Sequence, residues 1–215
     1  MSGFPVILSA PSGAGKTSIR QLLLQRRSDI GYSTSCTTRA RRSGESDGHD
    51  YYFYTREAFE AARDRDQFAE WAEVHGNLYG TLRSEIERTV QTGKHVLMDI
   101  DVQGARQFAA AFPDSVLIFI LPPSGEVLLK RLAGRGSEDR ERLLTRLRNA
   151  RAEMNEVGRY HYVVVNDDLP RAVDQVSAII DAEGLRHSRV QAVEEQVEAL
   201  IAQLEQEISH FSKGE

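Results

Sequence analysis

The feature that most constrains the fold of this chain is the stretch of residues 6–18, which reads VILSAPSGAGKTS. An apolar run leads into a glycine-containing loop, and a helical pattern of apolar residues begins directly after Gly15-Lys16-Thr17. Strand, loop and helix in this order are the context of a phosphate-binding loop. The motif G-x-x-x-x-G-K-[ST] is present with one departure, Ala10 in place of the first glycine, and alanine is the smallest substitute.

The residue types of this loop suit a phosphate anion. Gly13 and Gly15 lack a Cβ, so the backbone can turn tightly and approach the anion. The loop N–H groups and the helix N-terminus then point at phosphate oxygens. Lys16 can reach the β- and γ-phosphates, and the Thr17 hydroxyl can ligate Mg²⁺. The alternative is that a turn happens to precede Gly-Lys-Thr by chance. A chance turn would not explain why a strand pattern ends just before the loop and a helical pattern begins just after it.

Composition places the chain among ordinary globular proteins. Its 215 residues, 40% hydrophobic and 27% charged, allow one good-sized domain with small inserted lobes. The net charge of -5 argues against general nucleic-acid binding and leaves a nucleotide ligand open. No apolar run approaches the roughly 20 residues of a membrane span, and no secretion signal is apparent. With Cys36 as the single cysteine, these features predict a soluble cytoplasmic protein without a membrane partner.

Strand and helix patterns alternate along most of the chain. Apolar runs at 5–9, 95–100, 115–121 and 161–165 are each followed by a helical pattern. This α/β rhythm predicts a P-loop NTPase-type parallel sheet with helices on both faces, built from residues 1–31, 93–133 and 157–189. Residues 32–92 interrupt the rhythm as a separate lobe, and residues 134–156 form a smaller insertion.

Several helix ends carry their own sequence signals. Thr55 is predicted to cap a helix over residues 57–63, and Thr81 a helix that continues to about Thr92. Pro170 suits the first position of a helix that runs to about His187.

The tail, residues 190–215, has a pattern of its own. Apolar residues recur at three- and four-residue spacing from Val190 to Phe211, with Glu and Gln on the other faces. This predicts an amphipathic helix with a narrow apolar seam. Periodicity alone leaves two alternatives open: packing on its own domain, or self-association into a homo-oligomer.

Two carboxylates follow the second apolar run. A strand that ends in Asp99 resembles a Walker-B element, in which a carboxylate at the sheet's edge holds Mg²⁺ directly or through water. Asp101 can share that role or reach a second substrate. The alternative is that Asp101 caps the helix that begins at Val102.

The lobe contains a cluster with mixed chemistry. Arg39 and Arg42 are planar donors suited to bidentate phosphate binding. Glu70 lies between apolar neighbours and is expected to be partly buried. A buried carboxylate needs hydrogen-bond donors. A guanine offers two adjacent N–H groups on one edge, and adenine does not. The alternative partner for Glu70 is an arginine of the lobe. Hydroxyl donors come from Ser35, Tyr51 and Tyr79.

The arginine-rich segment after residue 130 also has two interpretations. Most of its arginines suit an exposed helix beside acidic residues. Phosphoryl transfer, however, develops charge that mobile arginines can stabilise, and a hinged segment can bring them in.

Taken together, these blocks resemble the guanylate kinase family over about residues 4–187. After the phosphate loop they read TTRxxRxGExxGxDYxF at 37–53, EWAEVHGNxYGT at 70–81, DIDxQGA at 99–105, PPS at 122–124, RLxxRG at 131–136 and VVVNDD at 163–168. Departures are Ala10, Arg41 in place of a common proline, and Leu82 where a small or hydroxyl residue is frequent.

The resemblance implies MgATP-dependent phosphorylation of GMP, or dGMP, to GDP. By position in this chain, Ser35, Arg39, Arg42, Tyr51 and Tyr79 hold the GMP phosphate, and Glu70, Thr81, Asp99 and Asp101 serve the guanine side. ATP is bound by Ser12, Gly13, Ala14, Gly15, Lys16, Thr17, Ser18, Arg131 and Asn166. Lys16, Arg39, Arg135 and Arg146 are the implied catalytic residues, and Thr17 and Asp99 the metal-side residues.

Under the same resemblance, residues 32–92 are the GMP-binding lobe and residues 134–156 the lid. Two other classes stay open: a guanylate-kinase-like protein-interaction module without catalysis, and a P-loop kinase of sugar phosphates. The intact Gly15-Lys16-Thr17 argues against the first. The base-reading block 70–81 has no evident use in the second.

Overall fold

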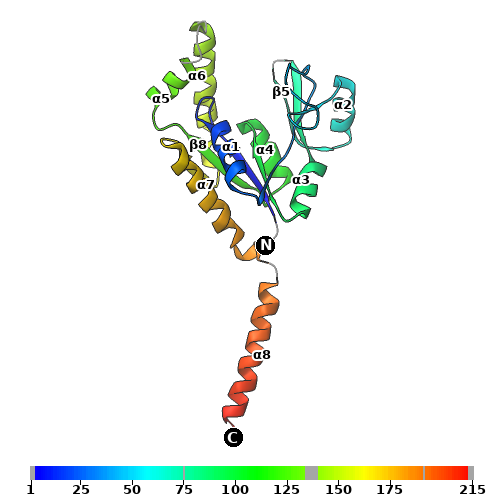
Figure 1. Cartoon of the computed structure of the whole chain (residues 1–215), viewed down its shortest axis with the longest axis vertical. Coiled ribbons are helices and arrows are strands. Elements are labelled where there is room, and N and C mark those ends of the chain that lie inside the picture. The colour runs from blue at the N-terminus through cyan, green and yellow to red at the C-terminus, as the bar shows by residue number, and fades with distance from the viewer. Residues whose placement is uncertain (1–2, 75, 134–139, 191, 213–215) are drawn as a thin grey trace.

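The computed structural model describes residues 3–74, 76–133, 140–190 and 192–212 of the chain. Figure 1 shows a body with two arms that rise on either side of a central sheet, and one long helix that leaves the body at the opposite end. No helix in the described ranges combines the length and apolar character needed to cross a membrane.

The central sheet has five parallel strands in the order β2-β7-β1-β8-β9. They are β1 (Pro5–Ser9), β2 (Ile30–Tyr32), β7 (His95–Asp99), β8 (Val116–Leu121) and β9 (Tyr162–Val165). Every residue of β1 is buried, as expected for a central parallel strand covered on both faces. The parallel α/β sheet predicted from the sequence is confirmed.

Helices cover both faces because side chains alternate along each strand. Val6 and Leu8 pack with α1 (Lys16–Arg26) and α7 (Leu169–Gly184). Ile7, between them, points to the other face, toward α3 (Arg83–Gln91) and α4 (Val102–Ala111). Because the strands are parallel, the helices that follow β1, β7, β8 and β9 begin at the same edge of the sheet, where the carboxyl ends of the strands meet.

A second sheet of four strands, β4-β3-β6-β5, forms one of the two arms (Figure 1). Its strands are β3 (Cys36–Thr37), β4 (Tyr52–Phe53), β5 (Phe68–Val74) and β6 (Asn77–Leu82). The helix α2 (Arg56–Asp64) packs Phe59 and Ala62 into the small core of this arm. Thr55 caps α2 as predicted, since its hydroxyl accepts from the N–H of Ala58 at 3.1 Å.

The boundaries of the arm differ from the predicted lobe. β2 belongs to the central sheet, and α3 packs Ile86 on that sheet, so the arm proper lies between them. The predicted cap at Thr81 is wrong. Thr81 lies in β6, and α3 begins after Leu82 without a side-chain cap.

The other arm consists of α5 (Gly125–Ala133) and α6 (Arg140–Met154), which pack through Leu128, Leu132 and Ala150. The first six residues of the predicted insertion 134–156 lie outside the described residues. Shortly after β9, Asp168 caps α7, and Pro170 takes the second helical position, after Leu169, rather than the first.

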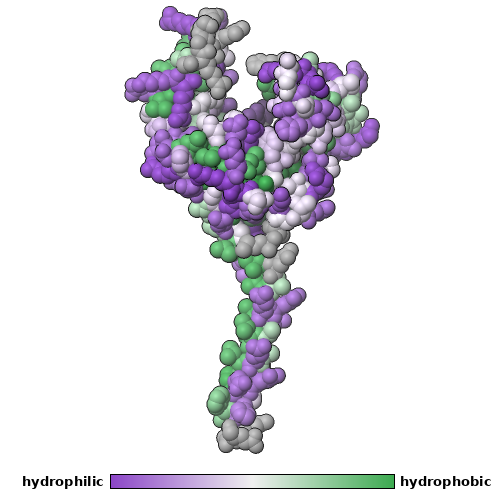
Figure 2. Space-filling view, in the orientation of Figure 1, coloured by the Kyte–Doolittle hydropathy of each residue, from purple (hydrophilic) through white to green (hydrophobic). Residues whose placement is uncertain are grey.

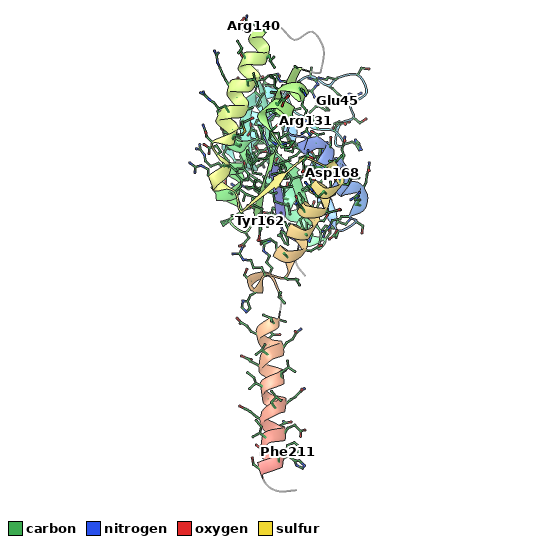
Figure 3. All side chains as sticks on the ribbon, turned by 90° about the vertical axis from the view of Figure 1, so that its left-hand side faces the viewer. Glu45, Arg131, Arg140, Tyr162, Asp168 and Phe211 are labelled. Atoms are coloured by element: carbon green, nitrogen blue, oxygen red, sulfur yellow. The ribbon has the colours of Figure 1, made fainter. Side chains whose placement is uncertain are left out.

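The tail forms α8 (Val193–Ser212), which stands clear of the body in two perpendicular views (Figures 1 and 3). No residue of α8 is buried. The structure therefore does not show the first alternative for the tail, in which the helix packs on its own domain.

Candidate active site

The phosphate loop lines a cleft of ≈ 1020 Å³ at the carboxyl edge of the central sheet. Gly13 and Gly15 have φ of 86° and 95°, a region that favours glycine. A Cβ on Gly15 would lie 2.2 Å from Nδ2 of Asn166, so the loop also needs glycine here for space. The structure thus brings Ser12, Gly13, Gly15, Lys16, Thr17 and Ser18 to one cleft, with Ala14 buried beneath them.

Two side chains from distant segments brace this loop. Asn166, directly after β9, donates from Nδ2 to the carbonyl of Ala14 at 2.7 Å. Arg131, from α5, donates to the carbonyls of Ala14 and Asn166, both at 3.3 Å. Both side chains also line the cleft, and Figure 3 shows Arg131 on the face of the molecule that carries Asp168.

Lys16 and Arg146 supply positive charge to the same cleft. Lys16 Nζ donates to the carbonyl of Ile100 at 2.9 Å, directly after β7. Burial lowers the pKa of Lys16, although Asp99 and Asp101 oppose that shift. Arg146, from α6, donates to the carbonyl of Leu132 at 3.2 Å and reaches the Ser12 hydroxyl at 3.4 Å.

An acidic group also reaches into the loop. Oε2 of Glu153, on α6, accepts the backbone N–H of Ser12 at 3.2 Å. This N–H is one of the donors expected to face a phosphate oxygen, so the carboxylate takes the position of an anion. Burial raises the pKa of Glu153.

A second cleft of ≈ 460 Å³ lies between the central sheet and the four-stranded arm. Thr17 and Asp101 line both clefts, so the two clefts meet at these residues. Asp99 lines the second cleft, and its Oδ1 accepts from Arg20 Nη1 at 3.0 Å and from the Tyr32 hydroxyl at 3.1 Å. The carboxylate at the end of β7 is thereby held in one orientation.

Glu70 is the buried acid of the second cleft, with 7% of its surface exposed. The Thr81 hydroxyl donates to its Oε1 at 2.6 Å across the β5–β6 pair. Desolvation raises the pKa of Glu70 to about 7, and the Thr81 bond moderates that rise. In the described part of the chain no arginine forms an ion pair with Glu70, so the alternative partner proposed from the sequence is not found.

Asp101 shows the alternative role that the sequence left open. Its Oδ1 accepts the N–H of Gly104 at 2.7 Å and so caps α4. Because Asp101 also lines both clefts, capping and ligand contact do not exclude each other.

Other predicted residues of the lobe meet at the mouth of the second cleft. Ser35, Tyr51 and Tyr79 line it, and the rings of Tyr51 and Tyr79 lie 6.1 Å apart. Arg39 lies 5.5 Å from the ring of Tyr51, with its guanidinium paired to Glu45 at 2.7 Å. Arg42 is exposed, and neither arginine lines the cleft. Arg135 lies outside the described residues.

Sequence reasoning missed three residues of the site: Arg20, Tyr32 and Glu153. Arg20 had a usable signal, since it follows Lys16 by four residues and must share its helix face. Glu153 had none, because its contact with Ser12 joins positions 141 residues apart.

A phosphate loop at the carboxyl edge of a parallel sheet, joined to a second cleft with a buried acid, defines a P-loop kinase that acts on a nucleotide. The guanylate kinase family model matches residues 2–183. The chain belongs to the guanylate kinase family.

Individual relatives agree with this assignment. A guanylate kinase of Syntrophotalea carbinolica is 48% identical over 191 residues, covering 89% of this chain and 91% of that protein. One of Aromatoleum aromaticum is 46% identical over 188 residues, covering 87% and 92%. The crystal structure of guanylate kinase from Anaplasma phagocytophilum matches with a TM-score of 0.74 at 36% identity, covering 92% of this chain and 95% of that one.

Proposed function

We propose that this protein transfers the γ-phosphoryl group of ATP to GMP or dGMP, which gives ADP and GDP or dGDP. The observation that carries the proposal is the junction of the two clefts at Thr17 and Asp101. One cleft contains a phosphate loop, and the other contains a buried carboxylate. Two substrates bound there meet with their phosphates at the junction, as in-line transfer requires.

In the second cleft, ionised Glu70 accepts the two adjacent N–H groups of the guanine edge. Thr81 orients that carboxylate through its 2.6 Å hydrogen bond. Asp99 and Asp101 extend the polar wall of the cleft on the sheet side. A base without two adjacent donors leaves Glu70 buried and unpaired, which costs affinity.

At the mouth of the same cleft, Ser35, Tyr51 and Tyr79 donate to the GMP phosphate. Arg39 lies beside Tyr51 and exchanges its bond to Glu45 for a phosphate oxygen. Arg42 joins when the loop that carries both arginines turns inward. In this proposal the arm within residues 32–92 is the GMP-binding lobe.

The larger cleft holds ATP. The N–H groups of residues 12–18 surround its phosphates, and a phosphate oxygen replaces the Glu153 carboxylate on Ser12. Asn166 and Arg131 hold the loop in shape and lie on the adenosine side. Lys16, Arg146 and Arg135 stabilise charge on the moving phosphoryl group, with residues 134–156 as the lid.

The residues at the junction also fit Mg²⁺. Thr17 presents an exposed hydroxyl there, and Asp99 and Asp101 add carboxylate oxygens, the hard ligands that Mg²⁺ prefers. Oδ1 of Asp99 already accepts two hydrogen bonds, so Oδ2 would be the oxygen that serves the ion. When bound, the ion neutralises phosphate charge.

The test is ADP release by the purified chain with MgATP and one acceptor at a time: GMP, dGMP, AMP, CMP, UMP or ribose 5-phosphate. We expect GMP and dGMP to be used, and the other acceptors to give at most about one hundredth of the kcat/KM for GMP. An interaction module gives no ADP with any acceptor, and a sugar-phosphate kinase prefers ribose phosphate. Either outcome overturns the proposal.

A further inference from the structure

Gly104 lies in the first turn of α4, where helix formation alone gives no reason for a glycine. Its backbone is helical, so no left-handed conformation requires glycine at this position. Glycine also supports a helix less well than alanine does, because glycine loses more conformational freedom on folding. Gly104 therefore weakens α4 slightly, and the packing around it shows the reason.

The space that a side chain on Gly104 would fill is taken by the carboxylate of Glu70. A Cβ on Gly104 would lie 2.9 Å from Oε2 of Glu70 and 3.3 Å from Oδ1 of Asp101. Cβ atoms essentially never come within 3.0 Å of such an atom, so an alanine at this position requires Glu70 to move. Gly104 is not among the residues that line the second cleft, so it acts on that cleft only through its neighbours.

Glu70 has little freedom to move away from an added side chain. It is buried, and its Oε1 accepts the Thr81 hydroxyl at 2.6 Å. The pairing of β5 with β6 shifts register between Phe68 and Glu70, as at a β-bulge. Phe68 packs in the small core of the arm, and Ala69 packs in the core of the central sheet with Ala105 of α4. The backbone that carries the carboxylate is thus held by both cores.

A second residue of α4 holds the same part of β5. Oε1 of Gln107 accepts the backbone N–H of Trp71, the residue after Glu70, at 3.1 Å. Gln107 follows Gly104 by three residues, so both lie on one face of the helix. Asp101, three residues before Gly104, caps the helix and lines both clefts. One face of α4 therefore reaches from the junction of the clefts to the strand that carries Glu70.

We propose that Gly104 is a positioning residue for the carboxylate of Glu70. Because Gly104 has no side chain, the first turn of α4 lies directly against Oε2, and the carboxylate keeps its bond to Thr81 while it lines the second cleft. Figure 2 shows the surface hollowed between the two arms, above the carboxyl edge of the central sheet. The inference rests on the role proposed above for Glu70, which is to accept the guanine edge.

The first test compares urea unfolding of the ligand-free wild type, Gly104→Ala, Glu70→Ala and the double variant. Alanine at position 104 favours the helix in both backgrounds, but only in the presence of Glu70 does it meet the carboxylate. We therefore expect the shift in urea midpoint caused by Gly104→Ala to be more favourable in the Glu70→Ala background than in wild type. An equal shift in both backgrounds would place the conflict at another group, such as Asp101, and would overturn the proposal.

The second test is steady-state kinetics with each substrate varied in turn. We expect Gly104→Ala to lower kcat/KM for GMP about ten- to a hundredfold and to leave the KM for ATP within about twofold of wild type, because only the base-reading group is misplaced. Gly125→Ala is the matched control, since a Cβ on this first residue of α5 meets nothing within 4 Å. Unchanged GMP kinetics in Gly104→Ala, or equal damage to GMP and ATP, would overturn the positioning role.

Wild-type activity on GMP separates a failure of this inference from a failure of the proposed function. If the wild type does not phosphorylate GMP, the proposed function fails, and positioning for guanine fails with it. The unfolding comparison still decides, without any nucleotide, whether Gly104 makes room for Glu70. If the wild type phosphorylates GMP and Gly104→Ala matches it in kinetics, only the positioning role of Gly104 is overturned.

Discussion

Arg20 holds the carboxylate of Asp99 by a 3.0 Å hydrogen bond from Nη1 to Oδ1. The two residues come from different elements, since Arg20 lies on α1 one turn after Lys16 and Asp99 ends β7. Tyr32 donates to the same oxygen and to no other described carboxylate. The orientation of Asp99, and hence the oxygen that it presents to the cleft junction, depends on Arg20.

Replacing Arg20 with methionine should therefore damage turnover more than folding. We expect kcat/KM for GMP to fall about ten- to a hundredfold, because a hydrogen bond between charged groups is worth about 1.5–3 kcal/mol. Steady-state kinetics with both substrates, together with a melting curve, measures the effect. Arg26→Met is the matched control on the same helix, where Arg26 pairs with Asp174 in solvent. Equal activity of the two variants would remove Arg20 from the site.

The sequence predicted what depends on local pattern. Continuous apolar runs identified four of the five strands of the central sheet but missed the short β2, and the Gly15-Lys16-Thr17 motif located the phosphate loop. Thr81 shows where such reasoning fails. A threonine before a helical pattern predicts a cap, but pairing of β6 with β5 directs its hydroxyl to Glu70 instead. Contacts such as that of Glu153 with Ser12 depend on how distant elements pack, and local periodicity does not contain that information.

Lys16 should matter for the chemical step and much less for GMP binding. Lys16 lines the larger cleft and is not among the residues that line the second cleft, where we propose that GMP binds. We expect Lys16→Met to lower kcat by about a hundredfold or more, because a preorganised charge is lost. Calorimetric titration with GMP should give a Kd within about threefold of wild type. Lys130→Met, at an exposed pair with Glu126, is the control. A kcat near normal in Lys16→Met would contradict this role.

GMP affinity should depend on the ionisation of Glu70. The pKa of this carboxyl in the free protein is about 7, and only the ionised form accepts two guanine N–H groups. Below pH 7 the Kd for GMP should therefore rise about tenfold per pH unit. Calorimetry between pH 5.5 and 8.5 measures it. The phosphate of GMP also titrates near pH 6, so Glu70→Gln is the control that retains only the phosphate contribution. Identical pH profiles for the two proteins would exclude Glu70 as the titrating group.

Thr81→Val should shift the pH dependence of GMP binding to higher pH. The Thr81 hydroxyl donates to ionised Glu70 and so lowers its pKa against the effect of burial. Valine has nearly the same shape without the donor, so the pKa of Glu70 should rise. We expect the midpoint of GMP binding to shift to higher pH, with weaker binding at pH 7 and partial recovery at pH 9. A downward shift would contradict the hydrogen bond as the cause.

Glu70 should also make the ligand-free protein less stable above neutral pH. Its pKa rises from 4.5 in the unfolded chain to about 7 in the folded one. The folded state therefore holds its proton more tightly, and stability falls as pH increases from about 4.5 through about 7. The full effect is about 3 kcal/mol, at 1.36 kcal/mol per pKa unit. Glutamine does not ionise, so the variant Glu70→Gln should not lose this stability as the pH rises.

Glu70→Gln should accordingly unfold at higher urea concentration than wild type at pH 8, and the difference should shrink toward pH 5. Urea unfolding without nucleotide at the two pH values measures it, with the slope m checked for constancy. The same variant loses discrimination for guanine, because an amide presents one acceptor and one mismatched donor to the base. A gain in stability of equal size at both pH values would mean that packing, and not the charge of Glu70, is responsible. A gain confined to high pH would mean that this buried carboxylate is kept for its ligand at the expense of the fold.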